Sequence, residues 1–161
     1  MRDADFERLY ELEAQNLFGF LAYRTGDRAL AEDLLADTFE RALRSRRGFD
    51  RRRGTERNWL YAIALNLLRD QARRRAAEGR AVERAAVAPA PGGGGELDAV
   101  ADRDVLERAM RGLADEEREA IALRFGADLT VPEMAQLLGL PLTTVEGRVY
   151  RALRKLRERI P

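Results

Sequence analysis

The residues best suited to chemistry in this chain are the arginines of one short loop. The segment RRGFDRRRGTERN, residues 46–58, holds six arginines, a glycine toward each end, the aromatic Phe49 and the polar side chains of Thr55 and Asn58. Trp59 follows directly. Arginines attract phosphates, while aromatic faces and polar loop groups can receive bases that have left the stack of a duplex. The pattern predicts contact with single-stranded or melting DNA.

A simpler interpretation of the same loop stays open. Taken alone, Trp59 fits a core position on the helix that follows, and the arginines fit a solvated loop. The elements around the loop have to decide between the two interpretations.

The chain has no histidine and no cysteine. A disulfide framework, a Cys/His zinc site and thiol or imidazole catalysis are therefore excluded, and we expect no cofactor and no metal. A nucleic-acid-processing enzyme would need a cluster of carboxylates and a metal. The acidic residues instead fall at expected helix caps and on solvated faces, without a Gly-rich phosphate loop of the P-loop kind. We therefore expect a binding protein and not an enzyme.

The net charge of +1 hides four blocks of alternating sign. Residues 1–40 and 81–140 each carry a net charge of −6, whereas residues 41–80 carry +9 and residues 141–161 carry +4. Two separate basic regions predict two contacts with nucleic acid, and the acidic blocks leave surfaces for a basic partner. The alternative is a set of solvated helix faces.

The composition divides the chain at AAVAPAPGGGGELDA, a segment that cannot hold a helix. We expect a flexible linker over residues 79–100 between a first module, 1–78, and a second, 101–161. No apolar run approaches the roughly 18 residues of a membrane span, and the charged start MRDADFERLY is unlike a signal peptide. We expect a cytoplasmic protein without membrane insertion.

The first module predicts three helices around one core. Apolar residues recur at helical spacing over residues 4–24, 29–43 and roughly 57–77, and no alternating β-type segment interrupts them. An all-α fold follows. The stripes expected to be buried are Phe6, Leu9, Tyr10, Leu17 and Leu21; Ala31, Leu34, Leu35, Thr38 and Ala42; and Leu60, Ile63, Ala64, Leu67 and Leu68.

The second module predicts four helices that end in a helix-turn-helix. Asp115 is expected to cap the second helix, and Thr130 with Glu133 has the spacing of a capping box for the third. Ala135, Gly139 and Val145 have helix-turn-helix spacing, with an ordinary helical hairpin as the alternative. The last helix should bury Val145, Val149, Leu153, Leu156 and Ile160, and turn outward Thr143, Thr144, Glu146, Gly147, Arg148, Tyr150 and Arg151.

In this order the motifs resemble bacterial RNA polymerase sigma factors of the extracytoplasmic-function (ECF) group of the sigma-70 superfamily, over nearly the whole chain. AEDLLADTFERAL is similar to the clamp-binding helix of region 2, and FDRRRGTERNWLYAIALNLLRDQARRR to the promoter-melting loop and the helix behind it. LADEEREAIALRF and LTVPEMAQLLGLPLTTVEGRVYRALRKLRE resemble region 4. The resemblance implies a subunit that directs core polymerase to promoters and has no active site of its own.

The resemblance also implies three sets of contact residues. Those for the polymerase clamp are Asp33, Leu34, Asp37, Phe39 and Arg41. Those for the minus-ten element are Phe49, Arg52, Arg53, Thr55, Arg57, Asn58, Trp59, Arg69, Arg73 and Arg74. Those for the minus-thirty-five element are Thr143, Thr144, Glu146, Arg148, Tyr150, Arg151 and Lys155.

The implied partners are the β′ clamp and β flap of core RNA polymerase, promoter DNA and an anti-sigma factor. We expect a monomer when free and association with the nucleoid when bound to polymerase. A free-standing helix-turn-helix regulator is the alternative function; it would normally dimerise, and no dimerisation element is expected before Asp3 or after Pro161.

The sequence departs from the family pattern at Ala36, where the family usually has Gln, and at Glu146 and Gly147, where it usually has a basic residue and a serine. Glu146 could accept a hydrogen bond from cytosine, or form a capping box with Thr143 that starts the helix. We favour the cap, and we leave the upstream sequence preference open.

Overall fold

The computed structural model describes the backbone of residues 1–79 and 97–161 and the side chains of residues 1–79 and 104–161. Within these residues every regular element is a helix, so the predicted all-α fold is confirmed. Most of the expected linker, residues 79–100, lies outside the described residues, and its last part, from Leu97, belongs to a helix. Among the helices described, none has the length and apolar character needed to cross a membrane.

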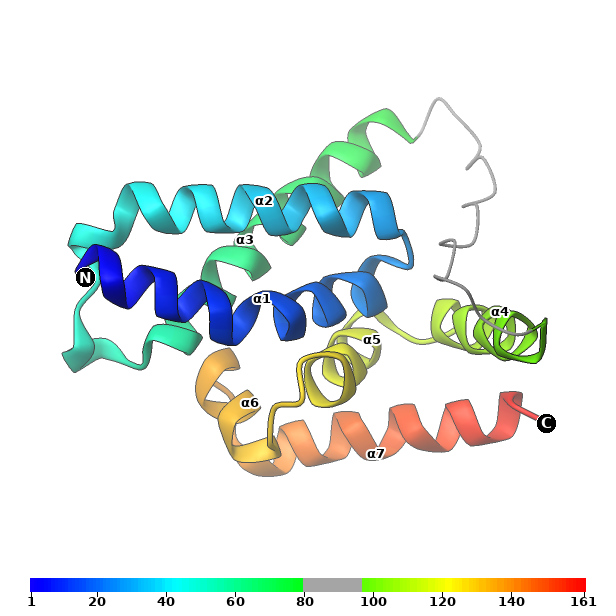
Figure 1. Cartoon of the computed structure of the whole chain (residues 1–161). Coiled ribbons are helices and arrows are strands. Elements are labelled where there is room, and N and C mark those ends of the chain that lie inside the picture. The colour runs from blue at the N-terminus through cyan, green and yellow to red at the C-terminus, as the bar shows by residue number, and fades with distance from the viewer. Residues whose placement is uncertain (80–96) are drawn as a thin grey trace.

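The N-terminal domain contains three helices: α1 (Asp3–Thr25), α2 (Arg28–Ser45) and α3 (Glu56–Glu78). Helices α1 and α2 lie antiparallel, and α3 crosses behind them (Figure 1). The turn between α1 and α2 uses Gly26 at φ 67° and Asp27, whose side chain accepts from Leu30 N–H at 3.1 Å. Between α2 and α3 the chain makes two 3₁₀ turns, η1 (Arg46–Gly48) and η2 (Arg51–Arg53).

The C-terminal domain contains α4 (Leu97–Arg111), α5 (Asp115–Ile121), the π-helical turn η3 (Ala122–Gly126), α6 (Val131–Leu138) and α7 (Leu142–Arg159). The predicted Thr130–Glu133 capping box is confirmed, since each residue bonds the other's backbone N–H. Asp115 is the first residue of α5 and not its cap. Ala114 holds the cap position, where its N–H donates to the Glu117 carboxylate at 3.0 Å.

The core confirms most of the predicted stripes and corrects some of them. In the N-terminal domain Leu9, Leu17, Leu21, Leu34 and Leu60 are buried. Tyr10 was expected inside but is 50% exposed, whereas Tyr61, which the pattern missed, is fully buried. On α7 the inward residues are Val145, Val149, Ala152 and Leu156, and the predicted Leu153 and Ile160 are exposed.

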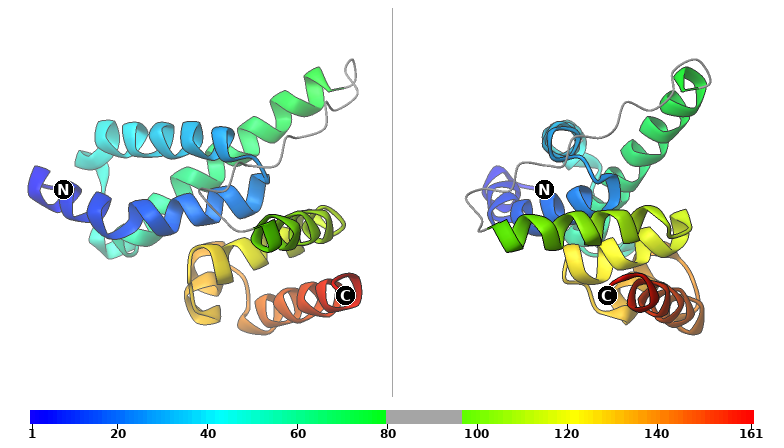
Figure 2. Two further views of the ribbon diagram at one scale, coloured as in Figure 1. Left: turned by 45° about the vertical axis from the view of Figure 1, so that its right-hand side comes forward. Right: turned by 90° about the vertical axis from the view of Figure 1, so that its right-hand side faces the viewer.

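The two domains share one hydrophobic core. Residues such as Leu17, Phe20 and Leu60 belong to the same buried cluster as Leu123 and Met134 of the C-terminal domain. Helix α1 lies against α5 and the π turn, and α3 lies against α6. Helix α7 lies on the side of α5 and α6 away from α1 (Figures 1 and 2). The shared core makes this arrangement a packed conformation, with the domains in direct contact.

The two backbones meet at a pair of glycines. A Cβ atom added to Gly19 of α1 would lie 2.5 Å from the carbonyl oxygen of Gly126, and one added to Gly126 would lie 2.8 Å from the carbonyl oxygen of Gly19. Any side chain at either position would therefore overlap the opposite backbone. A π turn is an uncommon element that often marks a functional position, and here it forms the C-terminal domain's side of the contact.

Candidate nucleic-acid interface

Two local side-chain caps fix the backbone of the arginine loop. The Asp50 side chain accepts from Arg52 N–H at 3.0 Å, and the Thr55 hydroxyl accepts from Asn58 N–H at 3.1 Å, which starts α3. Arg52 and Arg53 are exposed. The loop surrounds an open hollow of about 440 Å³ lined by Phe49, Arg51, Arg52, Arg53, Gly54, Thr55, Glu56 and, from α6, Gln136.

Trp59 belongs both to the core and to the loop. Its side chain is partly buried against the core, and its ring packs on Phe49 with centroids 5.3 Å apart and planes at 57°. The aromatic pair joins the loop to the rigid start of α3. Both sequence interpretations of Trp59 therefore describe part of its surroundings, and a role in DNA contact stays a prediction.

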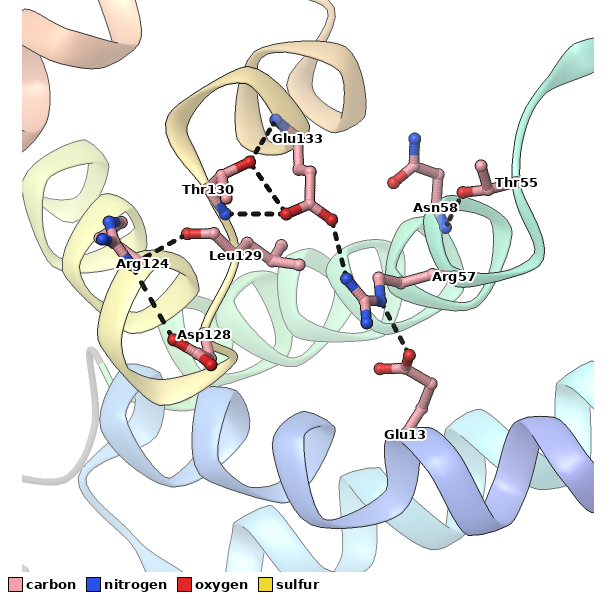
Figure 3. A network of polar contacts seen from close by, with 9 residues as sticks. All are labelled: Glu13, Thr55, Arg57, Asn58, Arg124, Asp128, Leu129, Thr130 and Glu133. Carbon is pink, nitrogen blue, oxygen red and sulfur yellow. Dashed lines mark hydrogen bonds and ion pairs between the residues drawn. The ribbon is translucent and has the colours of Figure 1, made fainter.

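Arg57 is the best-anchored cation of the loop. Its Nε donates to Glu13 of α1 at 2.8 Å, and its Nη1 donates to Glu133 of α6 at 2.8 Å (Figure 3). The hydrogen bond to Glu13 raises the pKa of Arg57 above its already high ordinary value. One guanidinium thus joins three helices from two domains.

Glu133 combines the cap of α6 with this ion pair. Its Oε1 accepts from Thr130 N–H at 3.0 Å, and its Oε2 faces Arg57. The backbone hydrogen bond from Thr130 holds the pKa of the Glu133 carboxyl below its ordinary value, and Arg57 adds to the effect. Nearby, Arg124 Nη1 donates to the carbonyl of Leu129 at 3.3 Å and braces the loop before α6.

Further along α3, the three predicted phosphate contacts Arg69, Arg73 and Arg74 are all exposed. Arg73 lies 3.8 Å from Asp70, one turn earlier on the same helix. The C-terminal part of α3 therefore presents a second group of exposed arginines, on the same helix that begins at the loop.

Helix α2 divides the predicted clamp contacts into two groups. Asp33, Asp37 and Arg41 are exposed, but Leu34 and Phe39 are buried at 4% and 7% exposure. The Phe39 ring packs against Phe6 and Tyr10 of α1, with centroids 6.3 and 4.8 Å away. Since Leu34 and Phe39 face inward in this conformation, they position the helix and do not present a surface.

The start of α7 corrects the predicted cap. The Pro141 carbonyl already accepts from Thr144 and Val145, so α7 begins at Leu142, and within the described residues no side chain caps it. Thr143 therefore lies inside the first turn, and the Thr143–Glu146 capping box is wrong. The turn before α7 follows the prediction, with Gly139 at φ 65° closing α6 and Val145 buried.

The predicted contact residues of α7 also fall into two groups. Thr143, Glu146, Tyr150 and Arg151 are exposed, and Thr144 is partly exposed. Arg148 lies 3.6 Å from Glu116, with 18% of its side chain exposed. Lys155 donates to Glu117 at 2.7 Å.

Glu117 explains the position of Lys155. It is buried at 5% exposure, and the hydrogen bond from Lys155 holds its pKa below the ordinary value. Lys155 therefore ties α7 to the start of α5. This structural role is one that the resemblance did not suggest.

Sequence reasoning missed Glu13 and the second contact of Glu133, the two carboxylates that hold Arg57 at the contact between the domains. Glu13 had a readable signal, because it sits on the buried stripe of α1 with Leu9, Leu17 and Leu21 at a spacing of four. A carboxylate at such a position requires a buried partner. Glu133 was recognised only as a cap, and its second oxygen contacts another domain that no local pattern could identify.

Comparison with known families matches both domains. Residues 9–78 match the model of Sigma-70 region 2, and residues 103–156 match the model of Sigma-70, region 4. The RNA polymerase sigma factor CarQ of Myxococcus xanthus is 34% identical over 95% of this chain and 87% of its own length. The ECF RNA polymerase sigma factor BldN of Streptomyces coelicolor is 31% identical over 97% of this chain, which spans 60% of BldN.

Two solved structures are similar to this one over nearly the whole chain. The sigma factor RpoE of Bartonella quintana, solved with the anti-sigma factor NepR, has a TM-score of 0.75 at 28% identity, with 96% of this chain and 95% of that chain covered. CnrH, solved with the cytosolic domain of CnrY, has a TM-score of 0.72 at 25% identity, with 98% and 88% covered.

Proposed function

The chain belongs to the ECF group of sigma-70 RNA polymerase sigma factors, and we propose that it directs core polymerase to specific promoters and initiates transcription there. The carrying observation is that both sigma regions match in order, each on a helical domain with its own basic surface. In this proposal the N-terminal domain, 1–78, melts the minus-ten element and the C-terminal domain, 101–161, reads the minus-thirty-five element. In the same proposal RNA synthesis belongs to the polymerase, and this chain acts as its promoter-specificity subunit.

For the minus-ten element the exposed part of the loop is the DNA-binding part. Arg52 and Arg53 are exposed and line the hollow together with Phe49, and the partly exposed Asn58 lies in the first turn of α3. Thr55 and Trp59 fix the loop on α3, since the Thr55 hydroxyl is used as a cap and the Trp59 ring packs on Phe49. The exposed arginines at the far end of α3 extend the same surface toward duplex phosphates.

For the minus-thirty-five element the outward residues of α7 provide the contacts. Tyr150 and Arg151 are exposed at the centre of the helix, and Thr143 at its start. With its capping role removed, the exposed Glu146 carboxylate is available to accept a hydrogen bond from the amino group of cytosine. Arg148 and Lys155 support this surface through their ion pairs with α5.

For the polymerase, the exposed charges of α2 form the docking surface. Asp33, Asp37 and Arg41 lie outward on a helix that Leu34 and Phe39 fix against the core. The acidic surface of α1 and α2 suits a basic partner, which fits the clamp in the role that the family assigns to it.

Regulation and location follow the family. RpoE and CnrH are each solved with a further protein, NepR and the cytosolic domain of CnrY, and the first of these is an anti-sigma factor. We propose an anti-sigma factor as a partner of this chain as well. The protein would be a cytoplasmic monomer when free and would join the nucleoid with polymerase.

Run-off transcription with core polymerase on a cognate promoter tests the proposal. The double variant Arg52→Ala/Arg53→Ala should keep core binding, lose open-complex formation and reduce the salt slope of promoter binding by about two. The matched variant Asp33→Asn/Asp37→Asn should weaken the pull-down of core polymerase and leave the salt slope of promoter binding unchanged. If the folded chain gave no transcript above core alone, the proposal would fail.

A monomeric mass together with capture of core polymerase separates this function from a free-standing helix-turn-helix regulator. A regulator of that class would form a dimer and would leave core polymerase behind.

A further inference from the structure

Arg57 has two carboxylate partners of different kinds. Glu13 belongs to the same domain and has only 6% of its side chain exposed, whereas Glu133 belongs to the other domain and has 38% exposed. The two carboxylates use different nitrogens of the guanidinium, Nε for Glu13 and Nη1 for Glu133. One partner can therefore leave while the other stays.

The bond to Glu13 orients the guanidinium. Within the described residues the second oxygen of Glu13 is buried without a hydrogen-bond partner, so its charge depends on Arg57. Removing one partner of a buried pair leaves an uncompensated charge, which is strongly unfavourable. Arg57 is therefore held in place by Glu13, with its Nη1 edge directed toward α6 (Figure 3).

Helix α6 occupies the place where DNA has to approach the loop. Gln136 lines the hollow of the arginine loop, and Glu133 places a carboxylate on the nearest anchored cation. A phosphate arriving at the loop would meet that negative charge and the body of α6. In this packed conformation the C-terminal domain thus covers the part of the DNA surface around Arg57, while Arg52 and Arg53 stay exposed.

A second argument, which rests on the proposed function, comes from the distance between the two promoter elements. Elements centred about 25 base pairs apart are separated by about 85 Å of duplex, at about 3.4 Å per base pair. A compact chain of this length has a radius of gyration of only about 15 Å. The packed domains cannot hold both elements at once, so they must part.

We propose that Arg57 exchanges the Glu133 carboxylate for a backbone phosphate of promoter DNA when the domains part, with Glu13 as the positioning residue that keeps the guanidinium in place. DNA and the C-terminal domain then compete for one cation. The helix-turn-helix domain therefore inhibits the melting loop until a phosphate takes the place of the Glu133 carboxylate on Arg57.

The conformational part is tested by a distance measurement. The chain has no cysteine, so Ala29→Cys and Glu158→Cys, both exposed, give a single labelled pair across the two domains. In this background Glu133→Gln should raise the ratio of open to packed chains up to about five-fold, the range of a partly exposed ion pair. Glutamine still accepts from Thr130, so the cap of α6 is kept.

The matched control is Glu116→Gln, which removes the pair with Arg148 inside the C-terminal domain and should leave the distance unchanged. Circular dichroism melting checks that each variant is folded.

The exchange is tested by DNA binding, with a short single-stranded deoxyoligonucleotide of mixed sequence as the probe. Glu133→Gln should bind it more tightly, by the same factor by which it opens the chain, because conformational and binding free energies are linked. Arg57→Gln, made in a Glu13→Gln background so that no buried carboxylate is left unpaired, should open the chain equally but bind DNA more weakly. Its salt slope should fall by about one relative to Glu13→Gln alone.

The exchange is supported if Glu133→Gln and the Glu13→Gln/Arg57→Gln variant lengthen the distance equally but change DNA affinity in opposite directions. An unchanged distance in Glu133→Gln would overturn the interdomain role of the pair. An opened Glu133→Gln with unchanged DNA affinity would overturn the exchange alone. If the wild-type chain and its holoenzyme bound no DNA, the proposed function would fail too, while the distance shift would still report the ion pair.

Discussion

Replacing Gly19 with alanine should drive the two domains apart without unfolding either of them. The new Cβ atom would lie 2.5 Å from the carbonyl oxygen of Gly126, where ordinary van der Waals contact begins at 3.4 Å. The backbones of α1 and the π turn would have to separate by about 1 Å at a contact between rigid elements, and overpacking of this kind costs about 1–3 kcal/mol.

The helical preference of alanine does not cancel this cost. Alanine stabilises a helix interior by about 0.5–1 kcal/mol relative to glycine, but α1 is helical in both the packed and the open chain. The full cost therefore falls on the packed state alone. It corresponds to a shift of about five-fold to about 150-fold toward the open chain.

The assay is the distance between labels at Ala29→Cys and Glu158→Cys, together with a melting curve. Gly147→Ala is the matched control, because Gly147 also lies inside a helix and its added Cβ would meet only the flexible end of Arg151, 3.1 Å away. We expect the control to raise stability slightly and to leave the distance unchanged. An unchanged distance in a fully helical Gly19→Ala would refute the reasoning and show that the π turn yields locally.

Three further predictions concern single side chains. Lys155→Ala leaves the buried Glu117 carboxylate without its ammonium and should lower the free energy of unfolding by about 1–3 kcal/mol, measured in urea; a loss as small as that of exposed Arg154→Ala would contradict the structural role. Trp59→Ala should cost about 2 kcal/mol through lost packing on Phe49 and should impair open-complex formation, followed by permanganate reactivity, more than core binding; a parallel loss of both would make Trp59 a core residue only. Because the folded-state pKa values of Glu117 and Glu133 lie below the ordinary 4.5, their stabilisation is complete above about pH 4.5 and is lost as pH falls through the lowered values; urea midpoints that already decline near pH 6 would contradict this assignment.

Local features were predictable from the sequence because local physics determines them. Helical spacing located every helix of the N-terminal domain to within about two residues, and the Thr130–Glu133 box was recognisable because both of its bonds lie within one turn. The same kind of reasoning failed at Thr143. The carbonyl of Pro141 starts α7 earlier, so that Thr143 lies inside the first turn and cannot cap the helix.

Features that depend on distant segments could not be predicted. Phe39 was predicted to be a surface contact of α2, but its ring packs on Phe6 and Tyr10, which belong to another helix. Glu133 and Arg57 are far apart in the chain, and nothing in either neighbourhood indicates the other. The charge of Glu13 on an apolar stripe was a signal that sequence reasoning overlooked, and which cation would pair with it depended on how α3 crosses α1.

The contact between Gly19 and Gly126 has a consequence for the rates of closing and opening. Two bare backbones meet only when both helices are in register to within a fraction of an ångström, so closing requires a precise encounter. When they part, the surface uncovered at this point is peptide, which water can hydrate immediately. The glycine pair should therefore slow the closing of the two domains, because few encounters have the required register. It should add little to the barrier for opening, because little apolar surface is exposed to water at this point.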